Sequence, residues 1–149
     1  MRLEDAIQQK NFESEYLKLA LNVMYTGNWL HMHQTRKLKK FGISHQQYNV
    51  LRILRGQYPQ AASVGSVLSR MLEPSSNITR LVDKLEQKKL VSRCENKDNR
   101  RMQELRITEE GLELLHQIGL VMDDLEVIFK GISEMDAKTA NDVLDAIRS

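Results

Sequence analysis

Residues 74–107 carry the side chains of this chain that are best suited to bind a polyanion. Within residues 74–86, apolar residues recur at the spacing of one helical face, at Ile78, Leu81, Val82 and Leu85. The opposite face carries hydrogen-bond donors and cations, namely Ser75, Ser76, Asn77, Thr79, Arg80 and Lys84. Arginine can pair with guanine and asparagine with adenine in the major groove, so this face predicts base readout in double-stranded DNA. A solvated helix surface is the alternative.

The helical period ends near Leu90, and residues 91–107 fit two short strands around a polar turn. The turn is cationic, with Lys97, Arg100 and Arg101 close together. Guanidinium groups are suited to a narrow minor groove and to its phosphates, so the hairpin predicts a second DNA contact. A charged surface turn without a ligand is the alternative.

The distribution of charge supports a polyanion-binding centre. Residues 36–106 contain 16 Lys and Arg against six Asp and Glu, a formal charge of +10. The rest of the chain contains six Lys and Arg against 14 Asp and Glu, a formal charge of −8. A basic middle between acidic ends indicates that the two parts have different partners, whereas an ordinary solvated surface is the simpler reading.

Three helices are predicted before residue 74. The first covers residues 11–40, begins at Asn11 or Ser14 and stops at Gly42. The second begins after Ser44, and the third begins after Ser63, behind a brief extended segment at residues 58–62. With the helix at residues 74–86, the short third helix makes a helix-turn-helix, for which a generic pair of antiparallel helices is the alternative.

A long helix follows the hairpin, with Thr108 as its expected N-cap. Its apolar residues step by three and four like a coiled-coil seam: Leu115, Ile118, Met122, Leu125, Phe129 and Ile132. A last helix is expected over residues 134–147 behind Ser133. A seam of this length needs the N-terminal helix or a second subunit to cover it, so the acidic ends are the predicted dimerisation region.

These elements predict a mainly α fold of the α+β winged-helix type, in a single domain over residues 1–149. Residues 44–107 form the expected winged helix-turn-helix, and residues 1–40 and 108–149 form the helical dimerisation part. No run reaches the ~18 apolar residues of a membrane span, and the N-terminus lacks the apolar core of a signal peptide. The single cysteine, Cys94, fits a cytoplasmic protein.

This order of elements resembles the multiple-antibiotic-resistance regulator (MarR) family of bacterial transcription factors, over roughly residues 12–147. The most specific parts are residues 75–86, SSNITRLVDKLE, and the wing signature Asp98-x-Arg100-Arg101 followed by residues 107–111, ITEEG. The resemblance implies a two-fold homodimer on a palindromic operator, usually a repressor and often released by a small aromatic ligand. It also implies that Asp98 ties down one of the wing arginines.

One position departs from the family pattern. Many relatives have glycine where this chain has Lys89, directly after the predicted DNA-reading helix. If the backbone there is left-handed, a lysine costs roughly 1 kcal/mol. It also adds a cation near the phosphates.

A small-molecule pocket is implied by the resemblance, because family ligands lodge between the dimerisation helices and the winged part. Trp29, His33 and Tyr48 are the candidates to line it, and a purely structural role in the core is the alternative. No metal site is predicted, since residues two apart on a helix, such as His31 and His33, point in different directions. No cofactor is expected. Cys94 fits a small half-buried residue better than a redox sensor.

The predicted function is therefore a sequence-specific regulator that binds double-stranded DNA as a homodimer. No catalytic residues are expected, because the chain has no phosphate-binding glycine loop, nucleophile elbow or HExxH motif. Two alternatives stay open: an architectural protein of the nucleoid, and a protein-binding adaptor that kept the winged fold without an operator.

Overall fold

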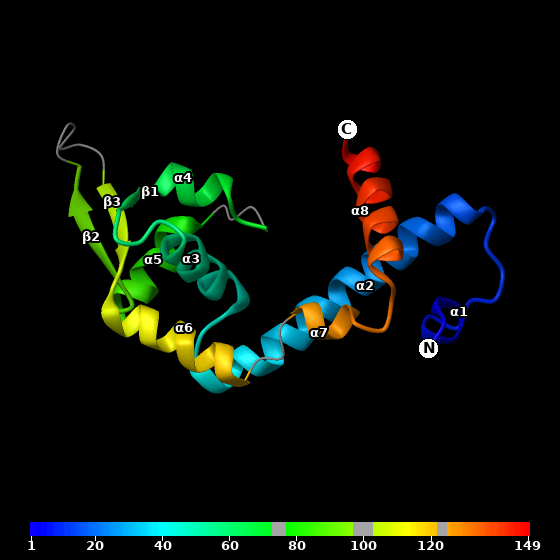
Figure 1. The fold of residues 1–149 in the computed structure, drawn as a ribbon, viewed down its shortest axis with the longest axis horizontal. Helices are drawn as coiled ribbons and strands as arrows, with labels where there is room; N and C mark the ends of the chain where they lie inside the picture. Colours follow the sequence, from blue (N-terminus) through cyan, green and yellow to red (C-terminus); the bar gives the residue numbers. More distant parts are fainter. Residues whose placement is uncertain (73–76, 97–102, 122–124) are drawn as a thin grey trace.

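The structure is a computed structural model that describes residues 1–72, 77–96, 103–121 and 125–149, with the side chains of 125 and 126 left aside. Figure 1 shows a winged part at one end of the molecule and helices α1 and α8 at the other, with α2 running between them. The elements are, in chain order, α1 (Leu3–Ala6), α2 (Glu15–Leu38), the 3-10 turn η1 (Lys39–Phe41), α3 (His45–Arg55), β1 (Ala62–Ser63), α4 (Val64–Ser69), α5 (Ile78–Gln87), β2 (Val91–Glu95), β3 (Gln103–Ile107), α6 (Glu109–Val121), α7 (Leu125–Phe129) and α8 (Glu134–Arg148). The mainly α fold with a small sheet is the predicted winged-helix architecture.

Helix α2 begins at Glu15, because the Ser14 side chain accepts a hydrogen bond from the Leu17 N–H. Of the two expected N-caps, Ser14 is therefore confirmed. The helix tightens into η1 and stops at Gly42, whose backbone is left-handed at φ 68°. A side chain is strained in that conformation and glycine is not, which explains the predicted stop.

Serine caps also fix the starts of α3, α4 and α8, as the sequence predicts. At α3, Ser44 and Gln47 exchange side-chain and backbone hydrogen bonds in a capping box. At α4 and α8, Ser63 and Ser133 accept from the backbone N–H three residues later. These bonds satisfy N–H groups that no helical carbonyl can reach.

The sheet has the order β1-β3-β2, and both pairs are antiparallel. Strand β2 pairs with β3 from Val91↔Ile107 to Glu95↔Gln103, and the two-residue β1 pairs through Ala62↔Leu105. The two wing strands are therefore confirmed. The extended segment expected at residues 58–62 is mostly wrong, because residues 56–59 form turns and only Ala62 of that segment lies in a strand. Beside β1, the Tyr58 hydroxyl donates to Glu109 of α6 at 2.9 Å, and that bond raises the pKa of Tyr58.

The hydrophobic core lies in the winged part. Its fully buried side chains include Leu51 and Leu54 of α3, Leu85 of α5 and Leu105 of β3. Leu38 is also 0% exposed, so the C-terminal end of α2 is built into the same core.

The predicted coiled-coil seam is divided between two environments. Leu115 and Ile118 are buried in the winged core at 3% and 0% exposure. Phe129 and Ile132 are about half exposed, beyond residues 122–124. The expectation of one continuous seam covered by the N-terminal helix or by a second subunit is therefore wrong for its first half, which the winged part covers itself.

Two helices differ from the predictions. The short helix α1 was not expected, because four residues are too few to show a hydrophobic period. Helix α5 begins at Ile78, with Asn77 in a non-helical conformation, so it starts later than the expected Pro74. Among the described residues, no helix combines the length and apolar character that crossing a bilayer requires.

Candidate nucleic-acid interface

Helix α5 separates its residues into a buried and an exposed face. Val82 and Leu85 are 1% and 0% exposed, and Ile78 and Leu81 pack against the same core. This is the apolar stripe that the sequence predicts, and its burial fixes which side of α5 meets solvent.

The predicted base-reading side chains that the structure describes all lie on the solvent side of α5. Asn77, Thr79, Arg80 and Lys84 are each exposed. They are placed where a ligand can reach them without any rearrangement of the core. The structure leaves Ser75 and Ser76 outside the described residues, so their predicted role is neither supported nor contradicted by position.

Arg93 of β2 joins helix α5 to the β2–β3 hairpin. Its guanidinium is 2.9 Å from Glu86 Oε2 and makes a second ion pair with Asp83. The Arg93 side chain is 26% exposed, so these pairs are partly shielded from water. Sequence reasoning missed Arg93 itself, since nothing local marks a partner ten residues away.

The turn after α5 is held by backbone bonds that need a left-handed residue. The N–H of Leu90 donates to the carbonyl of Leu85 at 2.9 Å, and that of Lys89 donates to Glu86 at 2.8 Å. This pattern places Lys89 at the position where glycine is preferred, and its φ is 60°. The sequence left open whether the backbone at Lys89 is left-handed, and the structure shows that it is.

Two contacts tie this turn to other elements. The Lys88 ammonium donates to the Gly42 carbonyl, so the end of α5 touches the link between α2 and α3. The Thr108 hydroxyl donates to the Lys89 carbonyl at 2.7 Å and accepts from the Gly111 N–H at 3.0 Å. Thr108 is thus the predicted cap of α6 and also the anchor of the turn.

The wing tip, with Lys97, Asp98, Arg100 and Arg101, lies outside the described residues. The strands that lead to it are paired as far as Glu95 and Gln103, and Asn96 donates to Glu104 at 2.6 Å. The base of the wing is therefore a regular hairpin.

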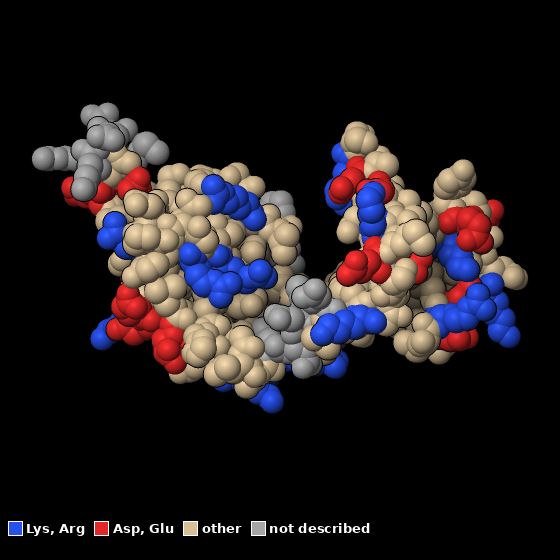
Figure 2. All heavy atoms as spheres, viewed as in Figure 1, with Lys and Arg blue, Asp and Glu red and all other residues tan. Residues whose placement is uncertain are grey.

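Basic side chains also lie elsewhere on the winged part. Figure 2 shows Lys and Arg on its visible face over α3 and α4, with acidic side chains near the start of α6. Arg52, Arg70 and Lys84 are all exposed, whereas the Lys88 ammonium is hydrogen-bonded to the Gly42 carbonyl.

The three predicted pocket residues do not line one described cavity together. Trp29 and His33 stack on α2 with ring centroids 5.9 Å apart, whereas Tyr48 lies on α3 beneath the Arg52 guanidinium. A cavity of about 280 Å³ lies beside Trp29, and its other walls come from α1 and the first half of α2. Neither His33 nor Tyr48 lines that cavity.

The structure brings together two histidines that are distant in sequence. The His31 and His45 rings lie 4.8 Å apart, and His45 is hydrogen-bonded to Gln34 at 2.6 Å. They form part of the packing between α2 and α3. Within the described ranges, no group of three His, Cys, Asp or Glu side chains is arranged to hold a metal ion. Cys94 is half-buried, with its sulfur 3.6 Å from the Glu104 carbonyl, as the sequence predicts for a structural residue.

Comparison with known protein families places the central part of the chain in a family. A family model described as the MarR family matches residues 43–102, which include α3, α4, α5 and β2. The chain is also similar to the HTH-type transcriptional regulator MhqR of Bacillus subtilis, with 32% identity over 104 residues, 68% of this chain and 69% of that protein. Matches to two regulators of Escherichia coli, PapX and PrsX, span about half the length of those relatives.

Solved structures of similar fold cover nearly the whole chain. CouR of Rhodococcus jostii bound to p-coumaroyl-CoA is 25% identical, with a TM-score of 0.74 over 91% of this chain and 95% of that one. A MepR–DNA complex of Staphylococcus aureus has a TM-score of 0.77 over 92% and 97%, and at 19% identity it shows the fold alone.

Proposed function

The chain belongs to the MarR family of transcription regulators, and from that premise we propose that it binds double-stranded DNA as a homodimer on an inverted-repeat operator. Helix α5 is the proposed reader of the major groove, and the β2–β3 hairpin is the proposed contact to the flanking groove. One observation carries this proposal: the buried stripe of α5 turns Asn77, Thr79, Arg80 and Lys84 to the solvent together.

The Arg93 ion pairs support the same proposed role of α5. A base-reading helix must keep a fixed angle to the strand pair beside it, because base edges are read by hydrogen bonds of defined direction. Arg93 fixes that angle by holding both acidic side chains on the near side of α5. The carboxylates are thereby neutralised next to a surface that must approach phosphates.

The proposed homodimer rests on apolar surface at the other end of the molecule. A groove of about 580 Å³ runs between α2, α7 and α8. Its lining includes Leu19, Val23, Phe129 and Val143, which are 40–45% exposed. Large contiguous apolar surface is characteristic of a subunit interface, so a second copy of the chain is the proposed cover.

Residues outside the described ranges complete the proposed interface. Ser75 and Ser76 precede α5 and are proposed to add hydrogen bonds to the bases or phosphates. Lys97, Arg100 and Arg101 are proposed to reach the minor groove, and Asp98 to orient one of these arginines. Their types and spacing support these roles, as does the regular hairpin beneath them.

We further propose that the regulator is a repressor released by a small aromatic effector. The relative CouR, crystallised with an aromatic acyl-CoA, supports an effector of this kind. Trp29 borders a described cavity and is the proposed contact residue, while His33 and Tyr48 stay candidates at the junction of α2 and α3. We propose that the protein acts in the cytoplasm and has no catalytic activity, because the proteins similar to it are transcription regulators.

Selection of bound sequences from random double-stranded DNA tests the core of this proposal. The expected product is a short inverted repeat with half-sites about one helical turn apart. Affinity for that repeat should fall with salt at a log–log slope on the order of −0.9 per phosphate neutralised. Selection of no preferred sequence would favour an architectural DNA-binding protein, and a flat salt response would favour a protein-binding adaptor.

Arg80→Ala then tests the reading face. Loss of one bidentate base contact should weaken operator binding by about 1–3 kcal/mol and relax the preference at one base pair. Arg2→Ala is the matched control, since Arg2 lies beside α1 at the opposite end of the molecule (Figure 1). Equal affinities of the two variants for the operator would contradict the assignment of α5.

A further inference from the structure

Leu72 is a large apolar residue that lies open to solvent in the winged part, between the end of α4 and the start of α5. It is 76% exposed. Among the described residues of 44–107, Tyr58 and Leu68 are the other exposed large apolar residues, at 45% and 37%. A single exposed leucine is ordinary on a protein surface, so exposure alone indicates no partner. The position of Leu72 and its fixed backbone are what distinguish it.

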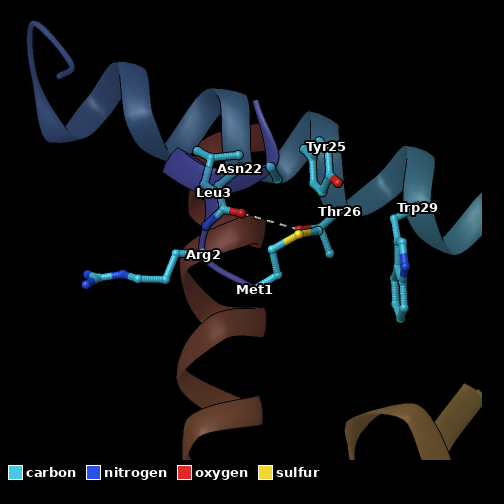
Figure 3. Close-up of a pocket in the computed structure, with 8 residues that line it drawn as sticks. Met1, Arg2, Leu3, Asn22, Tyr25, Thr26 and Trp29 are labelled. Carbon is cyan, nitrogen blue, oxygen red and sulfur yellow. Dashed lines mark hydrogen bonds between the residues drawn. The ribbon is translucent and has the colours of Figure 1, made fainter. Parts of the chain in front are cut away.

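The exposed apolar residues at the other end of the molecule have a different explanation. Leu19 and Phe129 line the groove that a second copy is proposed to cover, and Trp29 borders the cavity between α1 and α2 (Figure 3). Leu72 lines neither of them, and the helices that flank it, α4 and α5, lie at the opposite end (Figure 1). The proposed subunit interface therefore does not account for Leu72.

The backbone of Leu72 is held by two neighbouring helices. The preceding residue, Met71, is 9% exposed and belongs to the winged core, and its N–H donates to the Leu68 carbonyl at 3.2 Å. The N–H of Leu72 itself donates to the side-chain oxygen Oδ1 of Asn49, on α3, at 3.0 Å. The Leu72 side chain therefore extends into solvent from a backbone that α3 and α4 keep in place.

Leu72 lies within reach of the base pairs that α5 is proposed to read. Arg70, two residues before it, and Arg80 of α5 are both exposed. Leu72 is five positions from Asn77, so their Cα atoms are at most ~18 Å apart, which is about five base-pair steps along DNA. Recognition helices place their N-terminal residues against base edges. With α5 in the major groove, Leu72 therefore lies over the same half-site.

The major groove offers a leucine one favourable contact. The C5 methyl group of thymine is the apolar group on the base edges there, and apolar side chains read it. Phosphates and the other base-edge groups are polar, so a leucine that covers them removes water and gives no hydrogen bond in return. We propose that Leu72 contacts a thymine methyl group in each operator half-site and so specifies thymine at that base pair, with Asn49 as its positioning residue. This inference rests on the proposed function.

The burial of one methyl group sets the size of the expected effect. It contributes about fourfold to affinity, equivalent to ~0.8 kcal/mol. A homodimer on an inverted repeat makes the contact twice, once in each half-site. Removal of the methyl group from both half-sites should therefore lower operator affinity on the order of 15-fold.

Deoxyuridine in place of thymidine tests the contact, because it removes only the C5 methyl group and keeps the base pair. Each thymine of the selected operator is replaced in turn in both half-sites, and affinity is measured by fluorescence anisotropy of labelled DNA. At one symmetric position the parent protein should lose affinity on the order of 15-fold, whereas Leu72→Asn, with a polar side chain of similar size, should lose less than roughly twofold. Leu72→Met keeps an apolar side chain and should keep the methyl effect.

Two variants of Asn49 test its positioning role. Asn49→Asp keeps an oxygen that can accept from the Leu72 N–H, whereas Asn49→Leu has a similar size and no acceptor. The methyl effect should persist in Asn49→Asp and fall to less than about fivefold in Asn49→Leu, with urea unfolding to show that both variants are folded. A full methyl effect in Asn49→Leu would overturn the role of Asn49 and leave the contact of Leu72 standing.

The outcomes separate this inference from the proposed function. Equal affinity of the parent protein for the thymine and deoxyuridine operators at every position would overturn the thymine contact and leave operator binding standing. A methyl effect of the same size in Leu72→Asn at every position would also overturn it, since the methyl group would then be read by another residue. Failure to select any operator would overturn both proposals.

Methylated cytosine gives an independent check of the same contact. An operator with cytosine in place of the critical thymine should bind the parent protein more weakly. The 5-methylcytosine form restores the methyl group and should recover about fourfold in affinity per half-site for the parent protein and none for Leu72→Asn. Equal recovery in both proteins would contradict a contact between Leu72 and the methyl group.

Discussion

Lys89 allows a direct measurement of backbone strain at the end of α5, the proposed DNA-reading helix. Its φ of 60° is left-handed, and its N–H and that of Leu90 close the turn with bonds of 2.8 and 2.9 Å to Glu86 and Leu85. The carbonyl of Lys89 accepts from Thr108 at 2.7 Å, so the residue cannot relax without losing contacts. Lys89→Gly removes the strained Cβ and leaves every one of these backbone bonds in place.

The expected change is a small gain in stability. A left-handed conformation costs an L-residue about 1–2 kcal/mol, and glycine avoids that cost. Glycine also gives the unfolded chain more freedom, which offsets roughly 0.5–1 kcal/mol of the gain. The balance is a stabilisation of about 0.5–1 kcal/mol for Lys89→Gly, or a rise of roughly 1–4 °C in Tm for a chain of this size.

Urea and thermal unfolding at one fixed protein concentration measure this balance, because the apparent stability of an oligomer depends on concentration. Lys89→Ala is the control, since it removes the same ammonium group and keeps the Cβ; its stability should stay within ~0.5 kcal/mol of the parent. Gly42→Ala is the converse change, at a backbone φ of 68°, and should lose about 1–2 kcal/mol.

A Lys89→Gly variant that is no more stable than Lys89→Ala would refute the assignment of strain to the Cβ. Measurements of DNA binding test a second property of Lys89, its positive charge. If the Lys89 ammonium neutralises a phosphate, Lys89→Gly and Lys89→Ala should reduce the salt dependence of operator affinity equally, by close to one contact.

Three other expectations concern α6, the contact between β2 and α5, and α1. Gly111→Ala should cost about 1–3 kcal/mol in urea unfolding, because its Cβ would lie 2.4 Å from the carbonyl oxygen of Leu90; an unchanged midpoint would show that α6 shifts freely. Arg93→Met should lower stability by less than ~1 kcal/mol, since its ion pairs are partly exposed. Operator affinity of Arg93→Met, measured by fluorescence anisotropy of labelled DNA, should nevertheless fall more than tenfold. Equal losses of affinity for operator and for random DNA would contradict a role of Arg93 in positioning α5. The hydrogen bond from Lys18 lowers the pKa of Glu4. The stabilisation that this ion pair gives to the attachment of α1 is therefore complete above pH 4.5, the ordinary pKa of the carboxyl group, and is lost as the pH falls through the lower pKa of the folded protein. Trp29 fluorescence should report that loss, and Glu4→Gln should abolish the transition.

The features that the sequence predicts correctly are those that depend on neighbours along the chain. A serine N-cap needs only an N–H three residues later, which is why Ser14, Ser44 and Ser133 mark helix starts correctly. The burial of Leu85 and the exposure of Arg80 follow in the same way from the helical period.

The features that it misses depend on partners far along the chain. Leu115 and Ile118 share one spacing with Phe129, and periodicity alone cannot tell that the first two pack into the winged core. The contact of Arg93 with α5 requires the strand to lie beside the helix, which no local signal encodes. The attachment of α1 depends on the buried Leu3 and on the ion pair between Glu4 and Lys18, which are fourteen positions apart in the sequence.

The burial of Leu38 in the winged core anchors one end of α2 inside the part of the chain that is proposed to bind DNA, so α2 can act as a lever about that end. At 24 residues the helix is about 36 Å long. A tilt of roughly 10° about the buried end therefore displaces the far end by about 6 Å, nearly two base-pair steps of ~3.4 Å. Two such levers joined at their free ends would convert a small change at the joint into a change in the spacing of the two reading helices. Half-sites on DNA are separated by a fixed helical repeat, so a displacement of this size is enough to separate bound from released states without any refolding of the winged core.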